Sequence, residues 1–167
     1  MPAMPTAFVR LALFAALVAG PSPILAHGPV AKDAAGTTAL APSARPAAAM
    51  VDAFHSALRR GDTKAAAGLL ADDVLIFESG EVERSKTEYA AHHLGADAVF
   101  AKAVRSTVAR RSGAADGRTA WIVSEGRTIG SYKGQAIDLV TTETMLLRRV
   151  GRSWLIGHIH WSSAKRQ

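Results

Sequence analysis

The second half of the sequence consists of four long runs rich in β-branched and apolar residues, separated by short turns. The runs span 104–112, 118–130, 135–149 and 153–162, and each predicts a β-strand. The segments GAADG and SYKG between them have the glycines typical of hairpin turns. Four strands joined in this way predict an antiparallel meander, whose apolar face has to be covered by another part of the chain.

The preceding segment supplies helices for this cover. PAAAMVDAFHSALRRGD repeats apolar residues at helical spacing and stops near Gly61, and Asp62 is a suitable N-cap for a second, short helix. A strand (VLIFES) and a turn (GEVE) follow, and Ser85 with Glu88 forms a capping box at the start of a third helix. We therefore expect an α+β domain over residues 46–165, a cone-shaped curved antiparallel sheet packed on three N-terminal helices.

Residues 1–26 have the pattern of a secretory signal peptide. Arg10 precedes the apolar run LALFAALVAG, and small residues lead to a cleavage site after Ala26. The run is too short to span a bilayer as a helix, although an uncleaved anchor is the alternative. Residues 27–45 are small, polar and Pro-containing, which predicts a flexible linker. We expect a periplasmic or secreted protein that is not attached to a membrane after cleavage.

The composition narrows the classes of function. The chain has no Cys, so disulfides, thiolate metal sites and a lipoprotein anchor are excluded. Its formal net charge is +6, but aromatic residues do not interleave with basic pairs such as Arg110 and Arg111. We therefore expect no nucleic-acid partner.

The turn RRVGRSW predicts how the last two strands pair. A loop of two or four residues places Arg149 opposite Trp154, and regular alternation then places Glu143 opposite His160. His158 shares that face, which we expect to be the concave one. A carboxylate beside an imidazole raises its basicity and selects its tautomer, so the pair suits general acid–base chemistry. A buried, purely structural pair is the alternative.

The opposite face of the last strand is also apolar. It carries Leu155, Ile159 and Trp161 in this register, and such a face has to be covered. We therefore expect a homodimer across the sheet.

Two stretches of the chain resemble a known family. VDAFHSALRRGDTKAAAGLLADDVLIFESG and LLRRVGRSWLIGHIHWSS are similar to the opening helices and the closing hairpin of the nuclear-transport-factor-2-like superfamily, in its SnoaL-like and ketosteroid-isomerase-like branch. The resemblance covers about residues 47–163. It implies a cone with an internal pocket, while family members range from isomerases, cyclases and dehydratases to non-catalytic association domains.

The isomerase chemistry of that branch is not expected here. Ketosteroid isomerases use an Asp base together with a Tyr and a protonated Asp. The predicted strands contain one Asp, Asp138, and Tyr89 is on the third helix rather than the first.

The residue types still predict a pocket for a small organic ligand. We expect no cofactor, and the site is assigned by role: catalytic residues His160, His158 and Glu143, and ligand-binding residues Tyr89, His93, Glu78 and Trp154. A non-catalytic dimeric binding or association domain is the second hypothesis. A metal-binding periplasmic protein, with an ion held by His93, Glu143, His158 and His160, is a third that we do not favour, because no metal-binding motif supports it.

Overall fold

The computed structural model describes residues 39–166 of the chain. The predicted signal peptide, residues 1–26, and most of the predicted linker lie outside the described residues. The end of that linker belongs to the fold instead. Leu40 forms a β-bridge to Gly113, Pro42–Ala44 form a short 3-10 helix (η1), and Ala44 is fully buried. The folded domain therefore begins before residue 46.

Four α-helices accompany the sheet within residues 39–166, one more than predicted. The predicted third helix is divided at His93, which ends one helix and caps the next. The predicted helix ends are confirmed: Gly61 is left-handed with φ 74°, and the Asp62 side chain accepts a 2.9 Å hydrogen bond from the Ala65 N–H. The helices are α1 (Arg45–Arg60), α2 (Thr63–Gly68), α3 (Lys86–His92) and α4 (Leu94–Ala103).

In the described part of the chain the sheet has six strands, in the order β2-β1-β6-β5-β4-β3. The strands are β1 (Leu70–Glu78), β2 (Glu81–Glu83), β3 (Val104–Asp116), β4 (Thr119–Tyr132), β5 (Gln135–Val150) and β6 (Ser153–Lys165). The predicted meander and α+β class are confirmed. The sheet is mixed rather than antiparallel throughout, because β1 pairs in parallel with β6, and the predicted GEVE turn contains strand β2.

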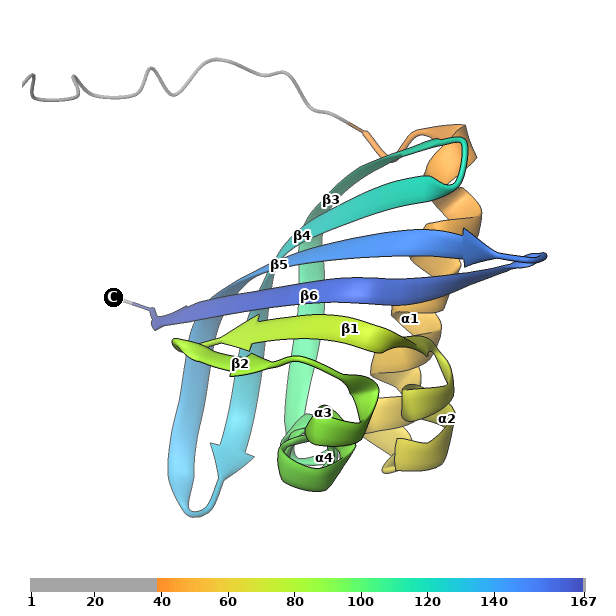
Figure 1. The fold of residues 1–167 in the computed structure, drawn as a ribbon. Coiled ribbons are helices and arrows are strands. Elements are labelled where there is room, and N and C mark those ends of the chain that lie inside the picture. The colour runs from red at the N-terminus through yellow and green to blue at the C-terminus, as the bar shows by residue number, and fades with distance from the viewer. Residues whose placement is uncertain (1–38, 167) are drawn as a thin grey trace, which may run out of the picture. The chain divides into compact units, whose positions relative to one another are not determined.

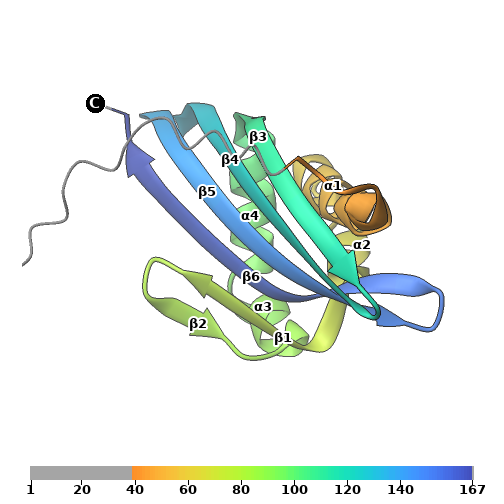
Figure 2. The same cartoon turned by 90° about the horizontal axis from the view of Figure 1, so that it is seen from above.

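The curved sheet carries helices α1 and α4 on its concave face, which we call the inner face (Figure 1; Figure 2). Val51 and Phe54 of α1 are fully buried there, together with Ile122, Met145 and Ile159 from three neighbouring strands. Burial of side chains of this size contributes about 1.5–3 kcal/mol each, so this layer stabilises the fold. No helix among residues 39–166 has both the length and the apolar character needed to cross a membrane.

The predicted register of β5 and β6 is correct near the turn and wrong beyond it. A two-residue loop pairs Arg149 with Trp154, as expected. The register then shifts between Leu146 and Leu147, and Gly157 is the extra residue of a β-bulge. Every later side chain of β6 consequently changes face.

The shift overturns two expectations about β6. Glu143 pairs with Trp161 instead of His160, and His158 and His160 lie on the outer face, beside Leu146 and Thr144. Ile159 and Trp161, predicted on an outer dimer face, point inward instead. Ile159 is fully buried, and Trp161 stacks on Phe54 with ring centroids 6.3 Å apart.

Candidate functional site

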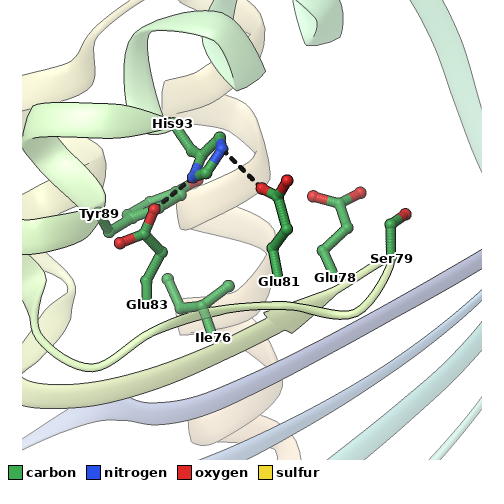
Figure 3. Close-up of a pocket in the computed structure, with 7 residues that line it drawn as sticks. All are labelled: Ile76, Glu78, Ser79, Glu81, Glu83, Tyr89 and His93. Carbon is green, nitrogen blue, oxygen red and sulfur yellow. Dashed lines mark hydrogen bonds and ion pairs between the residues drawn. The ribbon is translucent and has the colours of Figure 1, made fainter.

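A pocket of about 240 Å³ lies between the β1–β2 hairpin and helix α3. We call it the hairpin pocket (Figure 3), and its lining residues are Ile76, Glu78, Ser79, Glu81, Glu83, Tyr89 and His93. The volume is below the range of roughly 300–1,000 Å³ typical of drug-sized ligands. The pocket therefore suits a small molecule.

The hairpin brings three carboxylates to one face. Its two-residue turn has positive φ at both positions, 52° at Ser79 and 87° at Gly80, as tight hairpins require. Glu78 is then directly opposite Glu81, with Glu83 following on the same face of β2. Like charges directly opposite each other destabilise a sheet, so this arrangement is locally unfavourable for folding. Such a local conflict is typical of a functional site.

Helix α3 contributes the phenol, and its C-cap residue, His93, contributes the imidazole. The Ser85 hydroxyl accepts a 3.0 Å hydrogen bond from the Glu88 N–H, which confirms the predicted N-cap. Tyr89 and His93 follow four residues apart, so both face the hairpin. Figure 3 shows the His93 ring between Glu81 and Glu83. Nδ1 is hydrogen-bonded to Glu83, Nε2 lies 3.1 Å from Glu81 Oε2, and the Glu83 hydrogen bond is the main reason that the His93 pKa is raised.

Behind the pocket, Tyr89 is fixed by helix α4. The buried Tyr89 hydroxyl donates a 2.6 Å hydrogen bond to Asp97 Oδ2. Burial raises the pKa of Tyr89, and the charge of Asp97 raises it further. Burial also raises the pKa of Asp97, although the hydrogen bond from Tyr89 opposes this shift. Asp97 therefore positions the phenol.

Glu78 is the pocket carboxylate best suited to exchange a proton. Burial raises its pKa, and the like charges of Asp97 and Glu81 add to the effect, while His93 opposes it. The residue still reaches solvent. A carboxyl group that is accessible and less acidic than usual is suited to take up and release protons.

Glu143 has an imidazole partner, but that partner is His55 of α1 rather than His160. His55 Nε2 lies 2.7 Å from Glu143 Oε2, and the Trp161 indole N–H donates to the same oxygen at 2.8 Å. Burial alone would raise the pKa of Glu143, but these hydrogen bonds and the charges of His55 and Arg111 outweigh it and lower the pKa. The other oxygen, Oε1, is buried without a hydrogen-bond partner among residues 39–166.

Sequence reasoning missed His55, although a signal was present. Positions 51, 54, 55 and 58 form the apolar stripe of an amphipathic helix. A histidine within such a stripe needs a polar partner from the opposite layer, and Glu143 supplies it.

The predicted site residues thus fall into separate places. Glu78, Tyr89 and His93 meet in the hairpin pocket. Trp154 is buried elsewhere, and the Arg149 guanidinium lies over its ring, with the guanidinium carbon 6.0 Å from the ring centroid. Glu143 is in the interior. On the outer face, His160 is exposed, and His158 Nδ1 donates a 3.0 Å hydrogen bond to the Leu75 carbonyl.

Because these residues lie apart, they cannot form the catalytic site predicted from the sequence or the metal site that was its third hypothesis. No single site contains Glu143, His158 and His160 together, and His93 lies in the hairpin pocket away from them.

A family model for a SnoaL-like domain matches residues 47–165. Similar solved structures include a candidate ketosteroid isomerase from Shewanella frigidimarina, with 39% identity, a TM-score of 0.68, and coverage of 70% of this chain and 94% of that one. A candidate calcium/calmodulin-dependent protein kinase II association domain from Xanthomonas campestris has 22% identity, a TM-score of 0.63, and coverage of 78% and 96%.

A third structure extends the range of names attached to this fold. It is a candidate dehydratase of the NTF2-like family from Streptomyces avermitilis, with 16% identity, a TM-score of 0.62, and coverage of 74% of this chain and 98% of that one. No curated protein matches the chain.

Proposed function

Because this chain belongs to the SnoaL-like domain family, within the NTF2-like superfamily, we propose that it binds a small organic ligand in the hairpin pocket and performs acid–base chemistry on it. One observation carries the proposal. Glu78, Tyr89 and His93 come from two separate segments and converge on one pocket. The carboxyl and the imidazole can donate and accept protons, and the phenol oxygen, whose own proton goes to Asp97, can accept a hydrogen bond from the ligand.

The charge of the pocket indicates the kind of ligand. Glu78, Glu81 and Glu83 line it, and His93 is the cationic side chain among the lining residues. A ligand with an amine or another cationic or hydrogen-bond-donating group is therefore favoured over an anion. The ordinary isomerase arrangement of an Asp base on a strand is not part of the proposal.

Each side chain has a distinct role in this proposal. Glu78 transfers the proton, and Tyr89, positioned by Asp97, contacts the ligand. His93 gains a free ring nitrogen when the ligand displaces Glu81, whose side chain is 72% exposed and thus displaceable. His93 then hydrogen-bonds the ligand while Glu83 holds the other ring nitrogen.

Native mass spectrometry of the protein purified from its own host would show a retained small molecule. A thermal-shift screen that compares matched small amines and carboxylates tests the charge preference, and Glu78→Gln and His93→Gln should abolish the shift. His160→Gln, on the outer face, is the matched control and should bind like the wild type. If the carboxylates bind and the amines do not, or if the pocket variants bind normally, the proposal is wrong.

The second candidate is a dimeric association domain, and it has its own observation. The outer face exposes a set of residues that we call the outer-face patch: Leu75, Phe77, Leu146, His158 and His160. Three of these are large apolar residues with 37–42% of their surface exposed. We propose that two chains pair through this patch, which replaces the dimer face predicted from the sequence.

We also propose that the protein is exported. The support is the signal-peptide pattern of residues 1–26. Intact-mass measurement of periplasmic or secreted material should give a chain that begins at His27, and a full-length chain in the cytoplasm would contradict this.

A further inference from the structure

Glu83 of the hairpin pocket also belongs to a second cluster, together with Glu88 and His92, two side chains that the proposed function does not use. Glu83, Glu88 and His92 place their potential ligand atoms within 4.8 Å of one another. We propose that they bind a divalent transition-metal ion of the zinc class. This site is independent of the ligand-binding role of the pocket, although Glu83 belongs to both.

Glu83 carries the main observation. Its side chain is only 7% exposed, and Oε1 is hydrogen-bonded to His93. Oε2 is buried and has no hydrogen-bond partner among residues 39–166; His92 Nδ1 lies 3.5 Å from it. A buried carboxylate oxygen that accepts no hydrogen bond is unfavourable for folding. A cation between Glu83 and His92 would satisfy it.

The three proposed metal ligands lie close together in the sequence as well as in space. All three residues lie within the segment 83–92, so closing the site orders only a short loop. Glu88 and His92 are four residues apart on α3 and share one face of the helix. Glu88 Oε2 also accepts a 2.6 Å hydrogen bond from the Arg84 N–H, which holds the carboxylate in place. The neighbouring cation, Lys86, is paired with Asp72 instead.

The donor set indicates the metal class. One imidazole nitrogen and two carboxylate oxygens suit zinc and its neighbours, with ligand distances of about 2.0–2.2 Å. Tetrahedral donors at such distances are about 3.3 Å apart, so the cluster has to contract slightly. His92 is exposed, so its side chain can rotate inward toward the two carboxylates. His93, which is hydrogen-bonded to Glu83 Oε1, then keeps the Glu83 carboxylate oriented toward the metal ion.

The test measures metal binding alone, with no organic ligand. The purified chain, stripped with a chelator, is titrated with Zn²⁺ by calorimetry and with Co²⁺ by visible absorption. We expect one ion per chain, and a reduction of affinity by more than about tenfold in both Glu88→Gln and His92→Gln. Gln also serves at the third position of a capping box, so Glu88→Gln keeps the helix start intact.

Glu125→Gln is the matched control, because it removes an exposed carboxylate from strand β4, outside the cluster, and it should bind the ion like the wild type. Circular dichroism of each chelated variant checks that it is folded. Equal affinity in the wild type, Glu88→Gln and His92→Gln would overturn the proposal, as would a failure of the wild type to bind either ion. Neither result would affect the amine screen that tests the pocket.

Discussion

Glu78 shows how a single residue serves the pocket at the expense of folding. Its pKa is raised in the folded protein by burial and by the like charges of Asp97 and Glu81. The native state therefore binds the Glu78 proton more tightly than the unfolded chain does. The stability linked to this group is fully present below the ordinary Glu pKa, and it is lost as the pH rises through the raised one.

Glu78→Gln should remove the loss of stability that accompanies the ionisation of Glu78. We expect the variant to be more stable than the wild type at neutral pH, by less than about 1 kcal/mol, because solvent screens a group that is partly exposed. The difference should shrink as the pH falls below the ordinary Glu value. Urea unfolding across a pH series measures it, with the surface variant Glu125→Gln as the control. A less stable Glu78→Gln at neutral pH would contradict the assignment.

His55 and Glu143 make the opposite case, in which a polar pair stabilises the interior. The Glu143 side chain is only 10% exposed, and its Oε2 is hydrogen-bonded to His55 Nε2 and to the Trp161 indole N–H. We expect His55→Ala to reduce the free energy of unfolding by about 1–3 kcal/mol, because it leaves a buried carboxylate short of a donor. Chemical denaturation measures the loss. A change within about 0.5 kcal/mol, as expected for a surface site, would show that the pair is not stabilising.

At the scale of the element, one glycine determines which face of the sheet each side chain of strand β6 occupies. Gly157 is the extra residue that keeps Trp154 and Ile156 on the same inner face as Ile159 and Trp161. Without the bulge, alternation would place Ile159 and Trp161 in solvent and His158 and His160 in the core. The bulge is thus a requirement of the hydrophobic core.

Deletion and substitution of Gly157 should therefore have opposite results. Deleting it shifts the register of the rest of β6, and we expect no cooperatively folded protein. Gly157→Ala should stay within about 1 kcal/mol of the wild type, because an added Cβ meets only the Leu146 carbonyl at 3.8 Å, an ordinary contact. Thermal unfolding separates the two cases. A stable deletion variant would show that the core does not depend on the bulge.

At the scale of the whole molecule, the two faces of the sheet differ in how they are covered. The inner face packs on α1 and α4 (Figure 2), while Leu75, Phe77 and Leu146 of the outer face are exposed. A patch of this kind on an otherwise folded domain typically marks an interface. The dimer proposed above would cover it.

Leu146→Glu tests the proposed dimer, because it introduces a charge into the outer-face patch, next to His158. We expect the wild type to sediment as a dimer at micromolar concentration and the variant as a folded monomer. Val99→Glu is the control, since Val99 is 60% exposed on α4, away from the outer face. A dimer that persists in Leu146→Glu would place the interface elsewhere. A wild-type monomer would show that there is no such dimer.

The sequence by itself determined the features that depend on local patterns. The helix caps at Asp62 and Ser85, the pairing of Arg149 with Trp154 and the meander of the last four strands follow from short-range hydrogen bonding and periodicity. The same patterns carried the family resemblance. They also placed Tyr89 and His93 on one helix face, since that needs only the spacing of four residues.

The tertiary structure alone decided which distant residues meet. Strand alternation has a period of two, so the single inserted residue at Gly157 reversed every later prediction on β6, and Glu143 came to face His55 instead of His160. The parallel pairing of β1 with β6 is equally nonlocal. It positions the β1–β2 hairpin, and with it Glu78, beside α3, where the side chains of the hairpin pocket converge. Such contacts depend on how layers pack, and no local pattern encodes them.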